Sequence, residues 1–274
     1  MMKIVVIPLV LLGLLIAYIQ FEAPILVFWL NNTNDGLSAS IAMSRLATLK
    51  EKSKILAQLE NQNSAARLFA IRTLAATQEA ELWTYLPQLC NDPDKEVRDA
   101  AVIASGNLKI KGSVPAIINY YNDGWADRTT RGMAMTRNAI TALIQIAHPS
   151  KKVVKILEGS VANDVYKDMM VKSFVQAPNK RFLPLYEKML RHSTHHERIE
   201  PVIKLVAKYA GKASAAKIHP CLNSKVPKVR IRAVKTLVKL KDKSAVAPMK
   251  KRLKKEKDKS VKAALKKAIK SLSA

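Results

Sequence analysis

The feature that most constrains this chain is a repeat of about 32 residues, because a repeating chain stacks its copies instead of wrapping around one core. Two similar stretches begin with Val-Arg at Val97 and Val229, which lie 132 residues apart, or four periods of 33. Within these stretches Leu108 matches Leu240. From about residue 36 onward, apolar residues recur at helical spacing between short polar segments. The copies therefore predict an array of short helices.

Each copy is predicted to form a pair of helices. In the clearest copy we expect Asp92 to cap the first helix and Pro93 to occupy its first position, where a missing N–H has no cost. Val97 and Ala101 then share an apolar face, and a second helix is expected after Ser113. One pair cannot bury both apolar faces, so neighbouring pairs must stack. With 8 glycines and 5% aromatic residues, the composition also disfavours a β-sandwich.

A known family shares this pattern. The segment DPDKEVRDAA, residues 92–101, resembles the signature of HEAT-like repeats, in the subgroup also found in phycobilisome lyases. The resemblance is good over 229–253 and partial over 66–92 and 261–272. It implies an all-α fold, a curved right-handed α-solenoid of the armadillo/HEAT type, whose second helices line a concave binding face.

The same period sets the number of pairs. Dividing the residues from Gly36 to Ala274 by about 32 gives seven to eight helical hairpins. In the middle of the chain only the helical rhythm supports the repeat. There it places three pairs at roughly 128–158, 161–191 and 195–222.

The N-terminus predicts one transmembrane helix ahead of the repeats. Ile4–Gln20 contains no charged side chain, and together with Ile25–Leu30 it exceeds the roughly 30 Å hydrocarbon core of a bilayer. A buried core helix is disfavoured because the segment lacks a polar stripe. We therefore expect a signal-anchor or transmembrane segment at 1–30 and a HEAT-repeat solenoid at 31–274.

A cleaved signal peptide is the alternative for this segment. Cleavage requires small residues at positions −1 and −3 before the cleaved bond. With Ala17 or Ala23 at −1, the large residues Leu15 and Phe21 stand at −3. An uncleaved single-pass anchor is therefore favoured. Lys3 and the amino terminus precede the span, so the positive-inside tendency favours a cytoplasmic N-terminus and exported repeats.

Positive charge gathers at the C-terminal end. The formal net charge is +26, and residues 211–274 hold 21 Lys or Arg against 3 acidic residues. The alternative is a solvated cap on the last repeats, but a cap does not require charges of one sign. We therefore expect a basic, partner-binding face, which comprises Lys228, Arg232, Lys235, Lys239, Lys250, Lys251, Arg252, Lys254 and Lys255.

This charge favours some partners over others. An acidic protein surface and anionic lipid headgroups would both be attracted, and the N-terminal helix would hold the chain at a membrane. Nucleic acid is disfavoured without being excluded. Lysine outnumbers arginine in this region, and aromatic side chains for stacking on bases are nearly absent there.

Residues able to carry chemistry are few. On one helix His192, His196 and Glu200 would stand one turn apart, which is a geometry that could bind a metal ion. A polar turn between two repeats is the favoured interpretation, because HEXXH-type spacing is missing. Cys90 and Cys221 are expected to be small buried residues, too far apart for a disulfide. We expect no cofactor.

The sequence thus predicts a non-catalytic, membrane-anchored HEAT-repeat adaptor that binds a protein partner. The alternative is a nucleic-acid-binding protein, because some DNA glycosylases use HEAT-like repeats to form a basic groove. An enzyme of the phycobilin lyase type ranks last, since the resemblance covers the scaffold and brings no identifiable catalytic residue.

Overall fold

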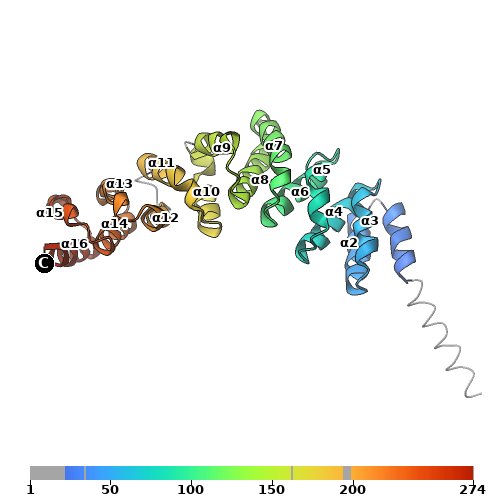
Figure 1. Cartoon of the computed structure of the whole chain (residues 1–274), viewed down its shortest axis with the longest axis horizontal. Coiled ribbons are helices and arrows are strands. Elements are labelled where there is room, and N and C mark those ends of the chain that lie inside the picture. Colours follow the sequence, from blue (N-terminus) through green and yellow to red (C-terminus); the bar gives the residue numbers. More distant parts are fainter. Residues whose placement is uncertain (1–21, 34, 162, 194–198, 274) are drawn as a thin grey trace, which may run out of the picture. The chain divides into compact units, whose positions relative to one another are not determined.

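The computed structural model describes residues 22–33, 35–161, 163–193 and 199–273 (Figure 1). These residues form α-helices joined by short turns, many of them 3₁₀ turns, and no strand occurs among them. The chain divides into two compact units, Met1–Ala142 and Leu143–Ala274, which we call the N-terminal and C-terminal units.

The N-terminal unit holds the first helices of the repeat. Residues 22–32 are helical. The elements that follow are α2 (Gly36–Thr48), α3 (Lys52–Ala57), α4 (Ser64–Ala76), α5 (Leu82–Leu89), α6 (Lys95–Asn107), α7 (Val114–Ala126) and α8 (Thr130–Ile146), in which the division between the units falls.

The C-terminal unit continues the same alternation. Its helices are α9 (Lys151–Val161), α10 (Asp164–Gln176), α11 (Leu183–Ser193), α12 (Glu200–Ala210), α13 (Ala215–Ile218), α14 (Pro227–Lys239), α15 (Val246–Lys255) and α16 (Lys259–Ser273). Counted along the described residues, seven consecutive pairs run from α2 with α3 to α14 with α15, and α16 follows. The helical repeat read from the sequence is therefore confirmed. Helices also occupy the three segments in the middle of the chain where pairs were expected.

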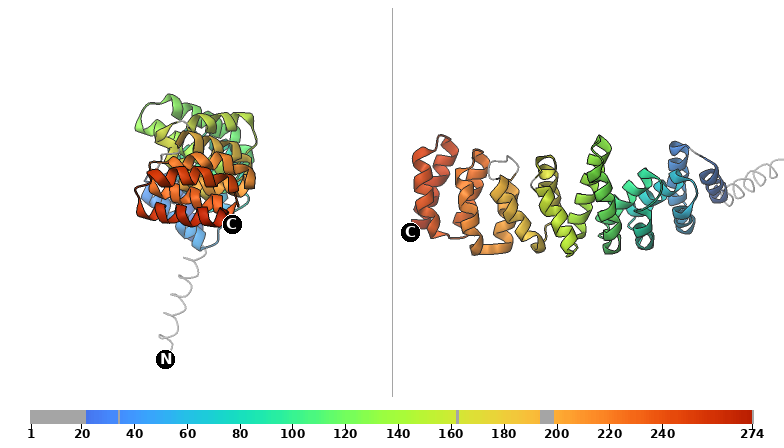
Figure 2. Two further views of the ribbon diagram at one scale, coloured as in Figure 1. Left: turned by 90° about the vertical axis from the view of Figure 1, so that its left-hand side faces the viewer. Right: turned by 90° about the horizontal axis from the view of Figure 1, so that it is seen from above.

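Within each unit the helices form two layers (Figure 2). The first helices of successive pairs contact one another. In the N-terminal unit α2 contacts α4, and α4 contacts α6. In the C-terminal unit α10, α12, α14 and α16 do the same, and we call these four helices the first-helix row. Second helices such as α9 and α11 form the other layer. The core lies between the layers, where Val97 and Ala101 of α6 and Val229 and Ala233 of α14 are fully buried.

Four of the first helices, α2, α4, α6 and α14, end in the same kind of turn. A non-glycine residue in the left-handed conformation follows the helix at Lys50, Gln78, Lys109 and Lys241, with φ between 53° and 59°. At each of these turns two backbone N–H groups bond back to carbonyls of the last helical turn, as Lys241 N–H does to the Val238 carbonyl at 2.9 Å. This Schellman arrangement satisfies the free carbonyls and reverses the chain toward the second helix.

An arginine with the same backbone contacts recurs at the start of several first helices. Arg67, Arg98 and Arg230 each donate from Nη1 to the two backbone carbonyls that lie five and six positions earlier, at 2.6–3.0 Å. Arg67 also pairs with Asp92 through two bonds of 2.8 Å. Each guanidinium thereby holds the turn that enters its helix, which explains the Val-Arg and Ala-Arg dipeptides of the repeat.

The Arg67 pairing changes the helix cap expected from the sequence. Asp92 does not cap α6, because its carboxylate is buried and bound to Arg67. The cap is Asp94, whose Oδ1 accepts from the N–H groups of Glu96 and Val97 at 2.8 and 3.1 Å. Pro93 accordingly lies before the helix. The DPD sequence contains two possible caps, and the neighbouring repeat decides between them.

The expected transmembrane helix requires a correction. In the part of the chain that the structure describes, no helix is both long and apolar enough to cross a membrane. Ile4–Gln20 lies outside the described residues. The run Ile25–Leu30, which was expected to lengthen that span, belongs to the helical residues 22–32, where Leu26 and Leu30 are buried by protein.

Polar contacts also join this helix to the repeats that follow. Glu22 forms an ion pair with Arg45 of α2, and the Leu30 carbonyl accepts a hydrogen bond from Asn63 at 3.1 Å. Through these contacts residues 22–32 pack against the repeats that follow them. They therefore do not lengthen a membrane-spanning helix.

Candidate functional site

A basic groove lies between α12 and α14 of the first-helix row. Its volume is about 610 Å³. Five basic side chains line it, and Ala207, Thr236 and Leu240 supply its less polar floor. The basic residues are Lys204, Lys208, Arg232, Lys235 and Lys239. We call this cavity the lysine groove.

An ion pair marks the end of the lysine groove at which both helices begin. Arg232 donates from Nε to Glu200, the first residue of α12, and the Lys204 ammonium lies 3.8 Å from the same carboxylate. Lys235 and Lys239 form no ion pair with any described residue and are exposed. Glu200 therefore offsets part of the charge at one end, and the lysines at the other end remain available to an anion.

The helices explain how the lysines come to face one another. On α14, Val229, Ala233 and Leu237 are buried at helical spacing, which turns Lys235 and Lys239 outward. On α12, Val202, Ile203, Leu205 and Val206 are buried and leave Lys204 and Lys208 on the exposed side. Neighbouring first helices thus bring two pairs of lysines, each pair one helical turn apart, to a single groove.

The nine basic residues expected from the sequence do not all lie together. Arg232, Lys235 and Lys239 line the lysine groove, and Lys228 lines the adjacent cavity between α10, α12 and α14. The remaining five, Lys250, Lys251, Arg252, Lys254 and Lys255, belong to α15, a second helix, and line neither cavity.

One of these α15 residues has a structural partner. Arg252 donates from Nε to the buried carboxylate of Glu256 at 2.9 Å. This contact holds the end of α15 against the turn before α16. We therefore assign Arg252 a structural role and not a role in partner binding.

The adjacent cavity carries charges of both signs. Its volume is about 440 Å³, and Asp168 and Lys172 of α10, Glu200 of α12 and Lys228 of α14 contribute to its lining. Val171 and Val175 supply apolar surface, and Val175 is exposed. This cavity extends the lysine groove along the first-helix row toward α10.

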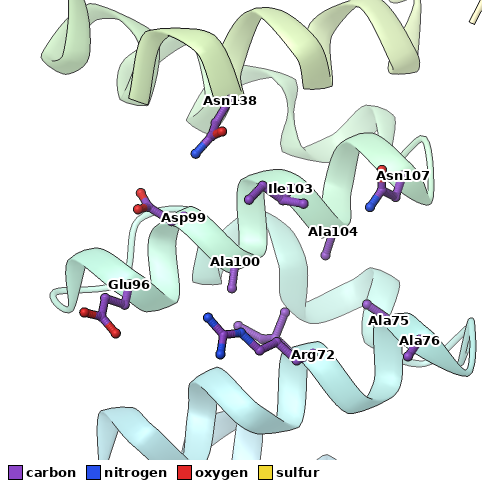
Figure 3. Close-up of a pocket in the computed structure, with 11 residues that line it drawn as sticks. Arg72, Ala75, Ala76, Glu96, Asp99, Ala100, Ile103, Ala104, Asn107 and Asn138 are labelled. Atoms are coloured by element: carbon purple, nitrogen blue, oxygen red, sulfur yellow. The ribbon is translucent and has the colours of Figure 1, made fainter. Parts of the chain in front are cut away.

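The N-terminal unit contains a comparable groove of different character. It has a volume of about 490 Å³ and lies over α4 and α6, with Asn138 of α8 at its edge (Figure 3). Ala75, Ala100 and Ala104 line it, together with Arg72 and two acidic residues. Charges of both signs therefore surround a floor of small side chains, whereas the lysine groove is dominated by positive charge.

One acid of this groove is held by a local network. Asp99 accepts from Arg131 at 2.6 and 3.0 Å and from the Tyr120 hydroxyl. Burial raises the pKa of Tyr120, and its bond to the Asp99 carboxylate raises it further. The phenol therefore stays protonated and serves as a donor that positions Asp99.

Two tyrosines precede Trp125 on α7. Tyr120 and Tyr121 are buried packing residues. Trp125 stacks on Tyr121, with the ring centroids 5.6 Å apart, and is 42% exposed. Trp125 therefore presents part of its surface to solvent.

Two of the three metal candidates lie on different helices. His192 belongs to α11, His196 lies outside the described residues, and Glu200 begins α12, where it binds Arg232. The three residues therefore do not share one helix. Among the described residues no group of three His, Cys, Asp or Glu is placed to hold a metal ion.

Both thiols are buried in their own units, as expected. Cys90 contacts Ser105, with Sγ and Oγ 3.6 Å apart, and burial raises its pKa to about 11. Burial raises the pKa of Cys221 to about 12. A thiol of such pKa is almost entirely protonated near neutral pH and is a poor nucleophile.

Lys204 and Lys208 are functional candidates that the sequence reasoning missed. They lie in the middle of the chain, where the repeat has little sequence resemblance to its neighbours. A signal was present nonetheless, because both lysines lie 31 residues before the groove residues Lys235 and Lys239. Projecting the C-terminal lysines back by one period would have found them.

Comparisons with known proteins agree with the helical repeat. A family model described as HEAT repeats matches residues 53–136 and 183–270, together more than half of the chain. No curated protein gives a significant match.

Two solved structures are similar to this chain. The complex of CpcE and CpcF of phycocyanin lyase from Nostoc sp. PCC7120 is 15% identical, with 81% of this chain and 94% of that chain covered and a TM-score of 0.43. The YibA protein of Escherichia coli is 16% identical, with 95% and 96% covered and a TM-score of 0.48. On the strength of the family match, the chain belongs to the HEAT repeat family.

Proposed function

We propose that this HEAT-repeat chain is a non-catalytic scaffold that holds an acidic partner protein on the first-helix row of its C-terminal unit. The observation that carries this proposal is the lysine groove, where five basic side chains surround a cavity of about 610 Å³. Repeat arrays present extended surfaces of this kind to protein partners.

The charge distribution supports an acidic partner. The C-terminal unit holds 33 Lys or Arg against 9 Asp or Glu, a net +24, whereas the N-terminal unit holds 14 against 12. Such a field raises the association rate of an anionic partner and disfavours a cationic one. The C-terminal unit is therefore the one that selects an acidic surface.

The composition of the groove favours a protein over a nucleic acid. Four of its five basic residues are lysines, which act as point charges and lack the planar fork with which arginine binds phosphates. No aromatic side chain lines the groove for base stacking, and Ala207 and Leu240 offer an apolar floor to a side chain. Carboxylates with small apolar neighbours match these features.

The absence of catalysis is part of the proposal and has its own support. Cys90 and Cys221 are buried with raised pKa values, so neither is poised as a nucleophile. Glu200, the acid at the edge of the lysine groove, is bound to Arg232 and is not positioned as a general base. The groove is thus equipped to bind and orient.

Two variants with the same change in charge test the proposal. The groove variant carries Lys204→Gln, Lys208→Gln, Lys235→Gln and Lys239→Gln. The control variant removes four charges from α15 by Lys250→Gln, Lys251→Gln, Lys254→Gln and Lys255→Gln. Both are exposed-surface changes and should retain the circular dichroism of the parent chain.

The probe is a fluorescent glutamate-rich peptide, measured by anisotropy at near-physiological salt. We expect the groove variant to lose at least tenfold in affinity and the control to lose less than threefold. Equal losses in both variants would show that the peptide responds to the overall positive charge of the C-terminal unit. That result would contradict binding in the lysine groove. A DNA duplex that binds more tightly than the peptide, with a steep salt dependence, would favour the nucleic-acid alternative.

A further inference from the structure

The lysines that face the groove belong to a longer pattern across the first-helix row. Lys172 of α10, Lys204 of α12 and Lys235 of α14 stand at equivalent positions, 32 and 31 residues apart, and are exposed. Lys267 of α16 continues the pattern after 32 more residues and is also exposed. Because α10, α12, α14 and α16 contact one another in order, these residues form a row that runs across the helices.

A second, shorter row lies about one helical turn further along. Lys208 follows Lys204 by four residues and Lys239 follows Lys235 by four. Both residues line the lysine groove, whereas the corresponding position on α10 is the uncharged Gln176. The groove is thus the place where two rows of lysines run together.

On α10 and α12 the sign of the charge changes along the helix. One turn before the first lysine row, Asp168 and Glu200 occupy equivalent positions 32 residues apart, and Arg232 follows at the same interval. Glu200 accepts from Arg232, so this level is a mixture of acids and bases. A negatively charged segment that ran along α12 would meet Glu200, whereas one that crossed the helices at the lysine level would meet only lysines.

From this arrangement we infer that the partner segment is an acidic peptide in the extended polyproline II conformation, which crosses α10, α12 and α14 and carries a carboxylate at every third residue. This inference rests on the proposed function. Packed helix axes lie about 8–10 Å apart. A polyproline II chain completes one turn in three residues and advances about 3.1 Å per residue, so carboxylates three residues apart point the same way and reach neighbouring lysines. The residues between the acids face Ala207 and Leu240 of the floor, which suits small apolar side chains.

An extended segment fits the groove better than a helix does. An α-helix with its side chains is about 10–12 Å wide, which is too wide to enter the space between two helices whose axes are 8–10 Å apart. It would rest on the lysine tips and leave the floor uncovered. A polyproline II chain is narrower, and between two carboxylates it can place a side chain on the floor.

Three peptides of equal net charge test the spacing on the full chain. The first has an aspartate at every third residue, with serine, valine and one central proline between, so that it cannot form a helix. The second has the same composition with its aspartates contiguous. The third is an alanine-rich helix with an acid at every seventh residue, which repeats after about 10.5 Å.

Affinities are compared by anisotropy for the parent chain and for single variants. We expect the first peptide to bind at least tenfold more tightly than the other two. Lys204→Gln and Lys235→Gln should each weaken it by about fivefold, whereas Lys250→Gln on α15 should leave it unchanged.

The outcomes separate this inference from the proposed function. If all three peptides bind equally and all are weakened by Lys204→Gln and Lys235→Gln, the groove binds acids but the extended geometry is wrong. If the helical peptide binds most tightly, the partner is a helix and the inference is overturned. If no peptide depends on either lysine, the proposed function fails as well.

Discussion

Arg230 of α14 and Glu256, the residue directly after α15, form a buried ion pair through two parallel hydrogen bonds. The distances are 2.7 Å from Nε to Oε2 and 2.8 Å from Nη2 to Oε1, and both side chains are at most 6% exposed. The same arginine donates to the Ser224 and Lys225 carbonyls. One guanidinium therefore joins the turn before α14 to the turn before α16, at the end of the array where charge is densest.

Removing one partner of this pair should destabilise the C-terminal unit. Glu256→Gln leaves Arg230 buried without its counter-charge, and breaking such a buried pair costs about 3 kcal/mol. Urea unfolding, monitored by circular dichroism, should show this loss of unfolding free energy. Glu81→Gln is a matched control, because Glu81 is half exposed in its contact with Lys52 and its loss should not move the transition. A destabilisation by Glu256→Gln no larger than that of the control would contradict this role.

The same carboxylate predicts a dependence of stability on pH. Burial raises the pKa of Glu256, but hydrogen bonds from Arg252 and Arg230 outweigh burial and lower it from 4.5 to about 2. Because the pKa is lower in the folded chain, the stabilisation is complete above about pH 4.5 and is lost as the pH falls toward 2. The pair should contribute about 3 kcal/mol across this window.

Urea unfolding of the parent chain and of Glu256→Gln from pH 6 to pH 2 isolates this contribution. The difference in unfolding free energy between the two chains should shrink as the pH falls. A constant difference would mean that Glu256 has an ordinary pKa in the folded chain.

The helical repeat was predictable because its signals are local. The i, i+4 apolar spacing of α6 and α14 fixes which faces are buried, and the period follows from Val97 and Val229. Pairings between repeats were not predictable in the same way. Asp92 looked like a helix cap, and only the position of Arg67, 25 residues earlier, shows that its carboxylate is used elsewhere.

The candidate site, too, was predictable from the sequence only in part. Charge counting identified the lysines of α14, because their spacing on one helix is visible in the sequence. It grouped them with the lysines of α15, since net charge carries no information about which layer a helix joins. It also extended an anchor through Leu30, because hydrophobicity does not distinguish burial in a repeat from burial in lipid.

The left-handed residue after α14 offers a stabilising change. Lys241 has φ 53° in a Schellman turn, a conformation that costs a residue with a side chain about 1 kcal/mol and that glycine adopts freely. Lys241→Gly should therefore raise the thermal midpoint. Lys235→Gly removes the same charge inside α14 and should lower it, because glycine weakens a helix interior. A lower midpoint for Lys241→Gly would contradict the turn assignment.

The two cysteines can report opening of the two units separately. Cys90 lies in the N-terminal unit and Cys221 in the C-terminal unit, and both are at most 1% exposed. With pKa values raised to about 11 and about 12, both thiols should react with a disulfide reagent at pH 8 far more slowly than a free thiol, until the chain opens.

Single-cysteine chains make this a test of where the Arg230–Glu256 pair acts. In a Cys90→Ser background, Glu256→Gln should speed the labelling of Cys221, because the turn that Arg230 holds begins three residues after this thiol. In a Cys221→Ser background the same change should leave the labelling of Cys90 unaltered, since each repeat is stabilised mainly by its neighbours. Equal acceleration at both thiols would show that the chain opens as one cooperative body, and the assignment of the pair to the C-terminal unit alone would then be wrong.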